Sequence, residues 1–333
     1  MKIIKAVISI LSIILLASCS SPSNKKLNIN REENMTSETV RDLIDKTYKT
    51  LPPRPALKFK VERGTPGLFD CKLGGIPYFP KDMEYPKGIE GEYKDTPLRL
   101  LVQINFEQIP HIPDFPETGI IQFFCACDDN EVYGMPVMFG ADDRCKQNGF
   151  RVIYHENIIT DKEKLMTADE MPDFSKYDEI DLRGFSFPFY GEYVLKAETI
   201  YEAMPYISDH RFQETFVKYY NEIAEVSVDD WYEVHNDVWE CDKEIWGEIN
   251  SREDDNVPQA FIGGYPYFVQ DDPRYYSDYK DCNTVLFELT STYNIKSDID
   301  IMWGDCGTGT FLIPSMALKN KDFSRVLYNY DCC

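Results

Sequence analysis

Basic residues, histidines and metal-binding cysteine spacings are scarce in this chain of 333 residues. Lys and Arg number 35 against 57 Asp and Glu, which leaves a formal net charge of −22 at pH 7. A field of this sign repels nucleic acid and anionic headgroups, and it attracts cations and basic proteins. The plainer alternative is that the acidity only keeps the protein soluble. The four histidines are scattered and no C-x-x-C pair occurs, so we predict no metal site and no cofactor.

Long apolar runs are equally scarce, and the main exception lies at the N-terminus. Lys2 and Lys5 precede an apolar run over residues 6–16, which leads into Leu16-Ala17-Ser18-Cys19. The run is too short for a membrane span and has the order of a secretory signal. The four residues at its end resemble the lipobox of bacterial lipoproteins, in which cleavage precedes the cysteine and its thiol receives a lipid. The alternative is a plain signal peptide with an incidental cysteine.

These features predict a signal peptide over residues 1–18 and lipidation of Cys19. The mature protein would then be anchored by lipid in a bacterial membrane, in the cell envelope and outside the cytoplasm. Ser20 follows Cys19 where an Asp would favour retention, so we expect the outer membrane where the cell has one. Residues 19–35 are polar and are predicted to be a flexible tether.

The body of the chain, residues 36–333, is predicted to be a single β-dominated α+β domain with an internal repeat. Gly74-Gly75-Ile76-Pro77-Tyr78-Phe79 returns as Gly263-Gly264-Tyr265-Pro266-Tyr267-Phe268. Each copy is followed by two apolar strands, and the third element begins 45 residues after the first glycine in one copy (119 − 74) and 46 in the other (309 − 263). We therefore predict two diverged repeats, about 68–125 and 258–314, as roll-like halves about a pseudo-twofold axis. The helical periodicity of residues 208–252 predicts a helical connector between them.

With these motifs in place, the chain resembles the YwqG-like family of bacterial proteins, from about Leu68 to the last residue. The resemblance implies a β-dominated, duplicated, roll-like fold and no particular activity. Two departures are the lipobox and Glu288-Leu289-Thr290-Ser291, where the family tends to have Gln-Leu-Asp-Ser. The matching segments are Gly74-Gly75-x-Pro77-x-x-Pro80, Leu101-x-Gln103-Ile104-Asn105-Phe106, Gly119-Ile120-Ile121-Gln122-Phe123-Phe124, Phe150-Arg151-Val152, Met302-Trp303-Gly304-Asp305-x-Gly307, Asp322-Phe323-Ser324-Arg325-Val326 and Asp331-Cys332-Cys333.

The glycine-rich stretch from Trp303 to Gly309 is the first candidate ligand-binding region. Its glycines would allow a tight turn that exposes Asp305 and Cys306. A nucleophilic cysteine needs a base, however, and no histidine lies nearby in the sequence. The alternative is a hairpin with Trp303 packed in the core.

The second candidate region consists of polar residues within apolar strands. Gln103, Gln122 and Glu288 would need hydrogen-bond partners if buried. Gln103 and Glu288 occupy matching places in the two repeats, so they would either face a shared cleft or fix loop backbones. Arg325 completes the candidate ligand-binding set, with a structural pairing to a carboxylate as its alternative.

The leading functional hypothesis is a non-enzymatic, lipid-anchored binding protein whose acidic surface or inter-repeat cleft holds a basic partner. One version is an immunity-type protein that neutralises a basic toxin domain. The competing hypothesis is a small-ligand receptor or an enzyme that uses Trp303, Asp305, Cys306 and the strand glutamines. A structural envelope protein without a discrete ligand is the third. We assign no catalytic residue.

Overall fold

The computed structural model describes residues 35–127, 133–135, 143–178, 187–241, 247, 249, 257–275 and 277–332. The predicted signal peptide, Cys19 and nearly all of the predicted tether lie outside these residues. Within the described part of the chain, no helix has both the length and the apolar character needed to cross a membrane.

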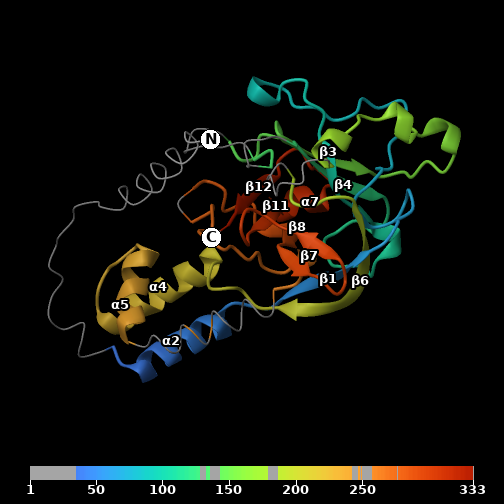
Figure 1. Cartoon of the computed structure of the whole chain (residues 1–333). Coiled ribbons are helices and arrows are strands. Elements are labelled where there is room, and N and C mark those ends of the chain that lie inside the picture. The colour runs from blue at the N-terminus through green and yellow to red at the C-terminus, as the bar shows by residue number, and fades with distance from the viewer. Residues whose placement is uncertain are drawn as a thin grey trace.

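One large antiparallel sheet dominates the structure (Figure 1). Its strands are β1 (Arg54–Arg63), β2 (Lys72–Gly74), β3 (Arg99–Asn105), β4 (Ile120–Cys125), β5 (Phe150–His155), β6 (Glu192–Ala203), β7 (Ala260–Gly263), β8 (Thr284–Thr290), β11 (Thr308–Ile313) and β12 (Leu327–Asp331). They lie in the order β12-β11-β8-β7-β1-β6-β2-β3-β4-β5. Two further strands, β9 (Thr292–Asn294) and β10 (Ile299–Ile301), form a separate hairpin. The prediction of a β-dominated fold is confirmed.

The long strands β1 and β6 form the middle of this sheet. They pair antiparallel from Arg54 opposite Ala203 to Arg63 opposite Tyr193. The strands β2 to β5 extend from β6, and β7, β8, β11 and β12 extend from β1. The sheet therefore has two flanks of four strands each, which we call the first flank (β2–β5) and the second flank (β7, β8, β11, β12).

The two flanks face one another across a shared apolar core. The ring of Phe123 in β4 lies 4.9 Å from the ring of Phe311 in β11 and 5.6 Å from that of Phe287 in β8. The outermost strands also approach, because Phe150 in β5 lies 5.1 Å from Tyr328 in β12. Strands β3 and β4 are buried along their whole length, which explains why they appear in the sequence as apolar runs without alternation.

The motifs of the predicted repeat lie at corresponding places in the two flanks. Both glycine pairs adopt the left-handed backbone, with φ of +63° and +68° at positions 74 and 75 and +72° and +67° at 263 and 264. A side chain on Gly74 would come within 2.5 Å of the Gly191 carbonyl oxygen, so glycine is required for the close approach of these strands.

The cross-strand register corrects one match within the predicted repeat. Gln103 pairs with Gln122 in the first flank, and Glu288 pairs with Thr310 in the second. Gly119 lies three positions before Gln122, and Gly307 lies three positions before Thr310. Gly119 therefore corresponds to Gly307, and the match to Gly309 made from the sequence spacing is two residues too late. The duplication itself stays a prediction.

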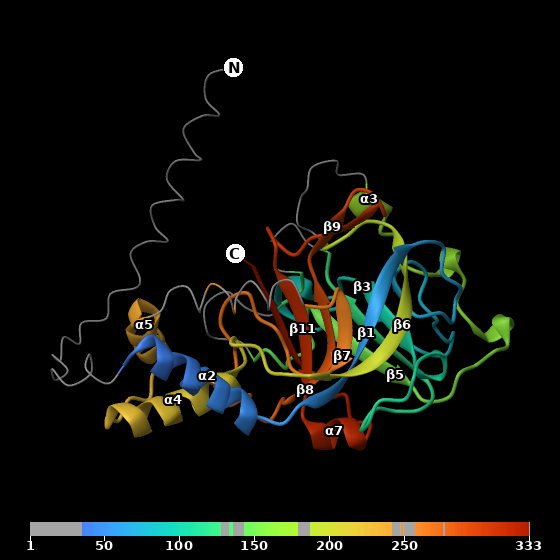
Figure 2. The ribbon, with the colours of Figure 1, turned by 90° about the horizontal axis from the view of Figure 1, so that it is seen from below.

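Three helices pack together at one side of the sheet, away from its core (Figure 2). They are α2 (Ser37–Thr50), α4 (His210–Ala224) and α5 (Trp231–Cys241). Thr36 caps α2 by accepting a hydrogen bond from the Thr39 N–H at 3.2 Å, a role that threonine commonly has at the start of a helix. Between α4 and α5, Glu225 takes the left-handed conformation with φ of 52°. The short helical segments are η2 (Gly91–Tyr93), η3 (Phe106–Gln108), η4 (Lys162–Lys164), η5 (Ala168–Glu170), α3 (Ser175–Asp178) and α7 (Ser315–Lys319).

Candidate functional site

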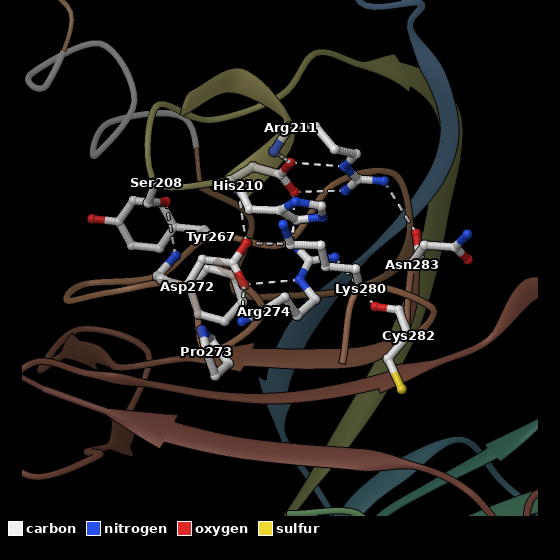
Figure 3. Close-up of polar contacts among 12 residues, drawn as sticks. Ser208, His210, Arg211, Tyr267, Asp272, Pro273, Arg274, Lys280, Cys282 and Asn283 are labelled. Carbon is white, nitrogen blue, oxygen red and sulfur yellow. Dashed lines mark hydrogen bonds and ion pairs between the residues drawn. The ribbon is translucent and has the colours of Figure 1, made fainter. Parts of the chain in front are cut away.

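A buried ion cluster joins the start of α4 to the segment that follows the second glycine pair. Its members are Asp209, Arg211, Asp272 and Arg274, and Figure 3 labels the last three of these beside His210. The Arg274 guanidinium donates to Asp209 at 2.9 Å and to Asp272 at 2.6 Å. Arg211 donates to Asp209 at 2.6 Å. The side chains of Asp209, Asp272 and Arg274 are completely or almost completely buried, so this is an ion network shielded from water.

The network also binds the backbone on both sides of the junction. Asp209 caps α4 by accepting a hydrogen bond from the Arg211 N–H at 2.9 Å. Asp272 accepts from the His210 N–H at 2.8 Å. Arg274 donates to the Cys282 carbonyl at 3.2 Å. The cluster therefore fixes the first turn of α4 to the second flank.

Electrostatics keep this cluster ionised. Burial by itself would raise the pKa of Asp209, but the charges of Arg211 and Arg274 outweigh it and hold this pKa well below its ordinary value. Burial opposes the charge of Arg274 as well, yet Asp209 and Asp272 raise its pKa above the ordinary value. The negative charges of the two carboxylates and the positive charges of the two guanidinium groups therefore compensate one another inside the protein.

Asp209, His210 and Asp272 also have the spacing of a metal site, with potential ligand atoms within 4.8 Å of one another. The chemistry around them argues against a cation. The Arg274 guanidinium donates to both carboxylates and so already supplies the positive charge between them. Burial lowers the pKa of His210, so its ring is neutral. The arrangement is structural.

An open pocket of 630 Å³ lies between the helices and the second flank. We call it the helix–sheet pocket. Its walls come from the link between β6 and α4, from α4 and α5, from residues 267–271, from the end of β8 and from the turn before β11. The residues that give it chemical character are Trp231, Tyr232, His235, Tyr267, Asp271 and Cys306.

The helix–sheet pocket is aromatic and acidic. Among the described residues that line it, Asp271 is the only Asp or Glu, and neither Lys nor Arg is present. Asp271 accepts a hydrogen bond from the Tyr232 hydroxyl, and partial desolvation raises the pKa of this carboxyl. Burial lowers the pKa of His235, so the pocket carries no fixed positive charge at neutral pH. In the sequence, residues 229–236 at the start of α5 contain three carboxylates and no Lys or Arg: Asp229, Asp230 and Glu233.

The predicted turn after Trp303 contributes to this pocket at one residue. Cys306 is exposed and lines it, while Asp305 is exposed at the turn beside it. Trp303 is fully buried, with its ring 5.8 Å from Tyr330. A side chain at Gly309 would come within 2.3 Å of the Trp303 ring, so this glycine is needed for the tryptophan to pack. The structure brings His235, distant in sequence, into the same pocket as Cys306.

The polar strand residues fix loop backbones instead of facing a shared cleft. Gln103 accepts from the Tyr78 N–H at 2.9 Å, and Gln122 donates to the Tyr78 carbonyl at 2.6 Å. In the other flank, Glu288 accepts from the Tyr267 N–H at 3.2 Å. All three side chains are completely buried. Of the two alternatives for Gln103 and Glu288, the structure therefore has the contact with loop backbones and not the shared cleft, because each is covered by the loop that it holds.

Arg325 lies on the surface, where its guanidinium donates to both carboxylate oxygens of Asp281 at 3.1 Å. It is not among the residues that line the helix–sheet pocket. The predicted set is therefore dispersed over the fold, and only Cys306 reaches the pocket. Ligand contact by the other members stays a prediction.

Sequence reasoning missed the ion cluster and most of the pocket. Asp209, Asp272 and Arg274 look like ordinary surface residues in the sequence, because nothing local shows that they are buried. The pocket residues Trp231 and His235 lie in a helical period and were interpreted only as part of a connector. The run of acids around them was the one available signal.

Comparison with known protein families identifies the family of this chain. The family described as "Domain of unknown function (DUF1963)" matches residues 71–332, which covers the whole sheet except β1, together with α4 and α5. The chain belongs to this family. No curated protein matches it.

Proposed function

We propose that this member of a family without an assigned activity is a lipid-anchored, extracytoplasmic, non-enzymatic binding protein of the YwqG-like type. In this proposal its helix–sheet pocket receives a cationic group of a basic partner. The observation that carries the proposal is the lining of the pocket, which combines aromatic rings with Asp271 and includes neither Lys nor Arg among the described residues.

The chemistry of the pocket favours a guanidinium or ammonium group. A cation over an aromatic face gains about 0.5–2 kcal/mol, more when water is excluded. The chain uses this contact internally, since the Arg211 guanidinium lies 4.4 Å from the ring centroid of Tyr265. The volume of 630 Å³ exceeds the needs of one side chain, so a peptide segment carrying that side chain fits better than a free ion.

The net charge supports the same class of partner at longer range. A formal charge of −22 steers basic proteins toward the surface and increases their association rate at low salt. A basic toxin domain neutralised by an immunity-type protein is one partner of this class. The anchor would place the pocket near the membrane, where such a domain would arrive.

The direct test is calorimetric titration of the full chain with a hexa-arginine peptide. We expect saturable binding that weakens as salt rises, and a loss of about tenfold in affinity for Asp271→Asn. The matched control is Asp82→Asn, which removes one exposed carboxylate that does not line the pocket. Equal weakening by both variants would show only diffuse attraction and would overturn the pocket as the binding site.

One observation favours a second candidate function, a small-ligand receptor or enzyme that uses thiol chemistry. Cys306 is exposed in the same pocket as His235, whose lowered pKa leaves its ring able to accept a proton. Labelling with iodoacetamide at pH 6 distinguishes this role. Selective modification of Cys306 that is lost in His235→Gln would favour it, whereas labelling no faster than that of Cys332 would count against it.

A further inference from the structure

Two cysteines that are far apart in the sequence meet beneath the second flank. Cys145 lies in the link between β4 and β5, and Cys282 lies just before β8. Both side chains are buried and share a small apolar cluster with Phe268, Val285 and Leu312. The two thiols therefore lie in one buried apolar cluster, where each affects the pKa of the other.

The backbones that carry these thiols are held in place independently of the sulfur atoms. The Tyr279 carbonyl accepts from the Cys282 N–H at 2.9 Å, and the Tyr279 hydroxyl accepts from the Arg144 N–H at 3.2 Å. Asp143 accepts from the Cys145 N–H at 2.9 Å. One tyrosine therefore contacts both segments and keeps them together, which is the preorganisation that a cross-link requires.

We propose that Cys145 and Cys282 form a disulfide bond when the chain reaches an oxidising compartment. The oxidant is a small disulfide or an oxidised dithiol protein. The Cys145 thiolate attacks one sulfur of that disulfide, forms a mixed disulfide and releases one thiolate. The Cys282 thiolate then attacks the Cys145 sulfur and displaces the second thiolate. Two protein thiols lose two protons and two electrons, and the oxidant is reduced to two thiols.

The exposure of the pair assigns the order of attack. Cys145 is 6% exposed, whereas Cys282 is completely buried. The oxidant therefore reaches Cys145 first, and Cys282 reacts second, from inside the fold.

The bond would connect the two flanks of the sheet. It would close a loop of 137 residues (282 − 145) and join the link between β4 and β5 to the segment that precedes β8. The link between β4 and β5 also contacts β12, since the Arg144 carbonyl accepts from the Tyr328 N–H at 3.2 Å. The disulfide would hold this link against the second flank.

Peptide mapping of the full chain tests the proposal. The folded protein is incubated with oxidised glutathione, denatured, alkylated without reduction and digested. We expect one peptide pair joined through Cys145 and Cys282, which separates after treatment with dithiothreitol. Alkylation of both residues as free thiols, or a bond from either of them to another cysteine, would overturn it.

A thermal measurement provides the second readout. Reduction should lower the Tm of the oxidised wild-type protein by about 5–10 °C. Cys145→Ser and Cys282→Ser should show no such shift, whereas Cys306→Ser should keep it, because that residue is exposed and lies outside the apolar cluster of the pair. A reduction-sensitive Tm in Cys145→Ser would contradict the proposal. If the serine variants do not fold, the peptide map of the wild-type protein still shows whether the disulfide between Cys145 and Cys282 forms.

Discussion

Glu288 and Gln103 perform the same task with different side chains. Each is completely buried and accepts a hydrogen bond from the backbone N–H of a tyrosine, Tyr267 and Tyr78 respectively. Burial raises the pKa of Glu288 well above its ordinary value, and the hydrogen bond from Tyr267 offsets this only in part. Glu288 is thus a neutral carboxylic acid that takes the place of an amide.

This equivalence predicts that Glu288→Gln stabilises the protein at neutral pH. A raised carboxyl pKa contributes stability below the unfolded value of 4.5, and that contribution is lost as the pH rises toward the folded value. The amide does not titrate and escapes this loss. We expect a gain of about 1 kcal/mol or more in the free energy of unfolding at pH 8, and little gain at pH 4, both measured by urea denaturation.

The reverse substitution is the matched control. Gln103→Glu places a carboxyl group in the equivalent buried position of the first flank and should destabilise the protein more at pH 8 than at pH 4. A Glu288→Gln variant that loses the same stability at both pH values would show that Glu288 is needed as an acid for another reason.

At the scale of elements, the position of α4 depends on a single buried guanidinium. Arg274→Met would leave Asp209 and Asp272 without their shared partner, although Arg211 would still contact Asp209. Removing one partner from a buried ion network costs about 3–5 kcal/mol. We therefore expect Arg274→Met to lower the free energy of unfolding by about that amount, measured by denaturation at pH 7.

The surface pair provides the comparison for this variant. Arg325 and Asp281 are 41% and 50% exposed, so Arg325→Met should lower the free energy of unfolding by less than about 1 kcal/mol.

The depressed pKa of Asp209 predicts how the stability conferred by the buried cluster depends on pH. Its stabilising contribution is present above the unfolded value of 3.8 and is lost as the pH falls below it. Similar costs for Arg274→Met and Arg325→Met would mean that the buried cluster does not hold α4.

Most of the elements could be predicted from the sequence, but their partners could not. Strands β3, β4 and β8 form apolar runs because both faces of each are buried. Strand β1 was missed, since charged residues such as Lys58, Lys60 and Glu62 alternate along it after a group of prolines. Its neighbours β6 and β7 lie far away in the chain, so local pattern carries no sign of its central place.

The candidate site was harder to predict because burial and spatial proximity create it. The residues Asp209, Asp272 and Arg274 are unremarkable until the fold removes them from water. Trp231 and His235 of α5 and the turn at Cys306 line one pocket only when α5 packs beside residues 267–271. The sequence alone indicated the helix and the turn, but not that they lie side by side.

At the scale of the whole molecule, the proposed anchor predicts how the protein partitions. The mature wild-type chain should begin at Cys19, carry added lipid and enter the detergent phase, because a diacyl group provides stable membrane attachment. Cys19→Ser should retain residues 1–18 and lack the lipid, whereas Cys306→Ser should behave as wild type. Intact-mass analysis and detergent partitioning measure both. A wild-type chain without added lipid mass would contradict the anchor.

The central pair of strands determines when this molecule is able to fold. Arg63 pairs with Tyr193 and Arg54 with Ala203. The residues of β1 therefore pair with residues that come 130 (193 − 63) to 149 (203 − 54) positions later in the chain. Its other neighbour, β7, comes later still. Folds dominated by such distant pairings form slowly. Strand β1 therefore stays unpaired until these later segments have been synthesised. In the proposed location outside the cytoplasm, this delay would suit a chain that crosses a membrane before it folds.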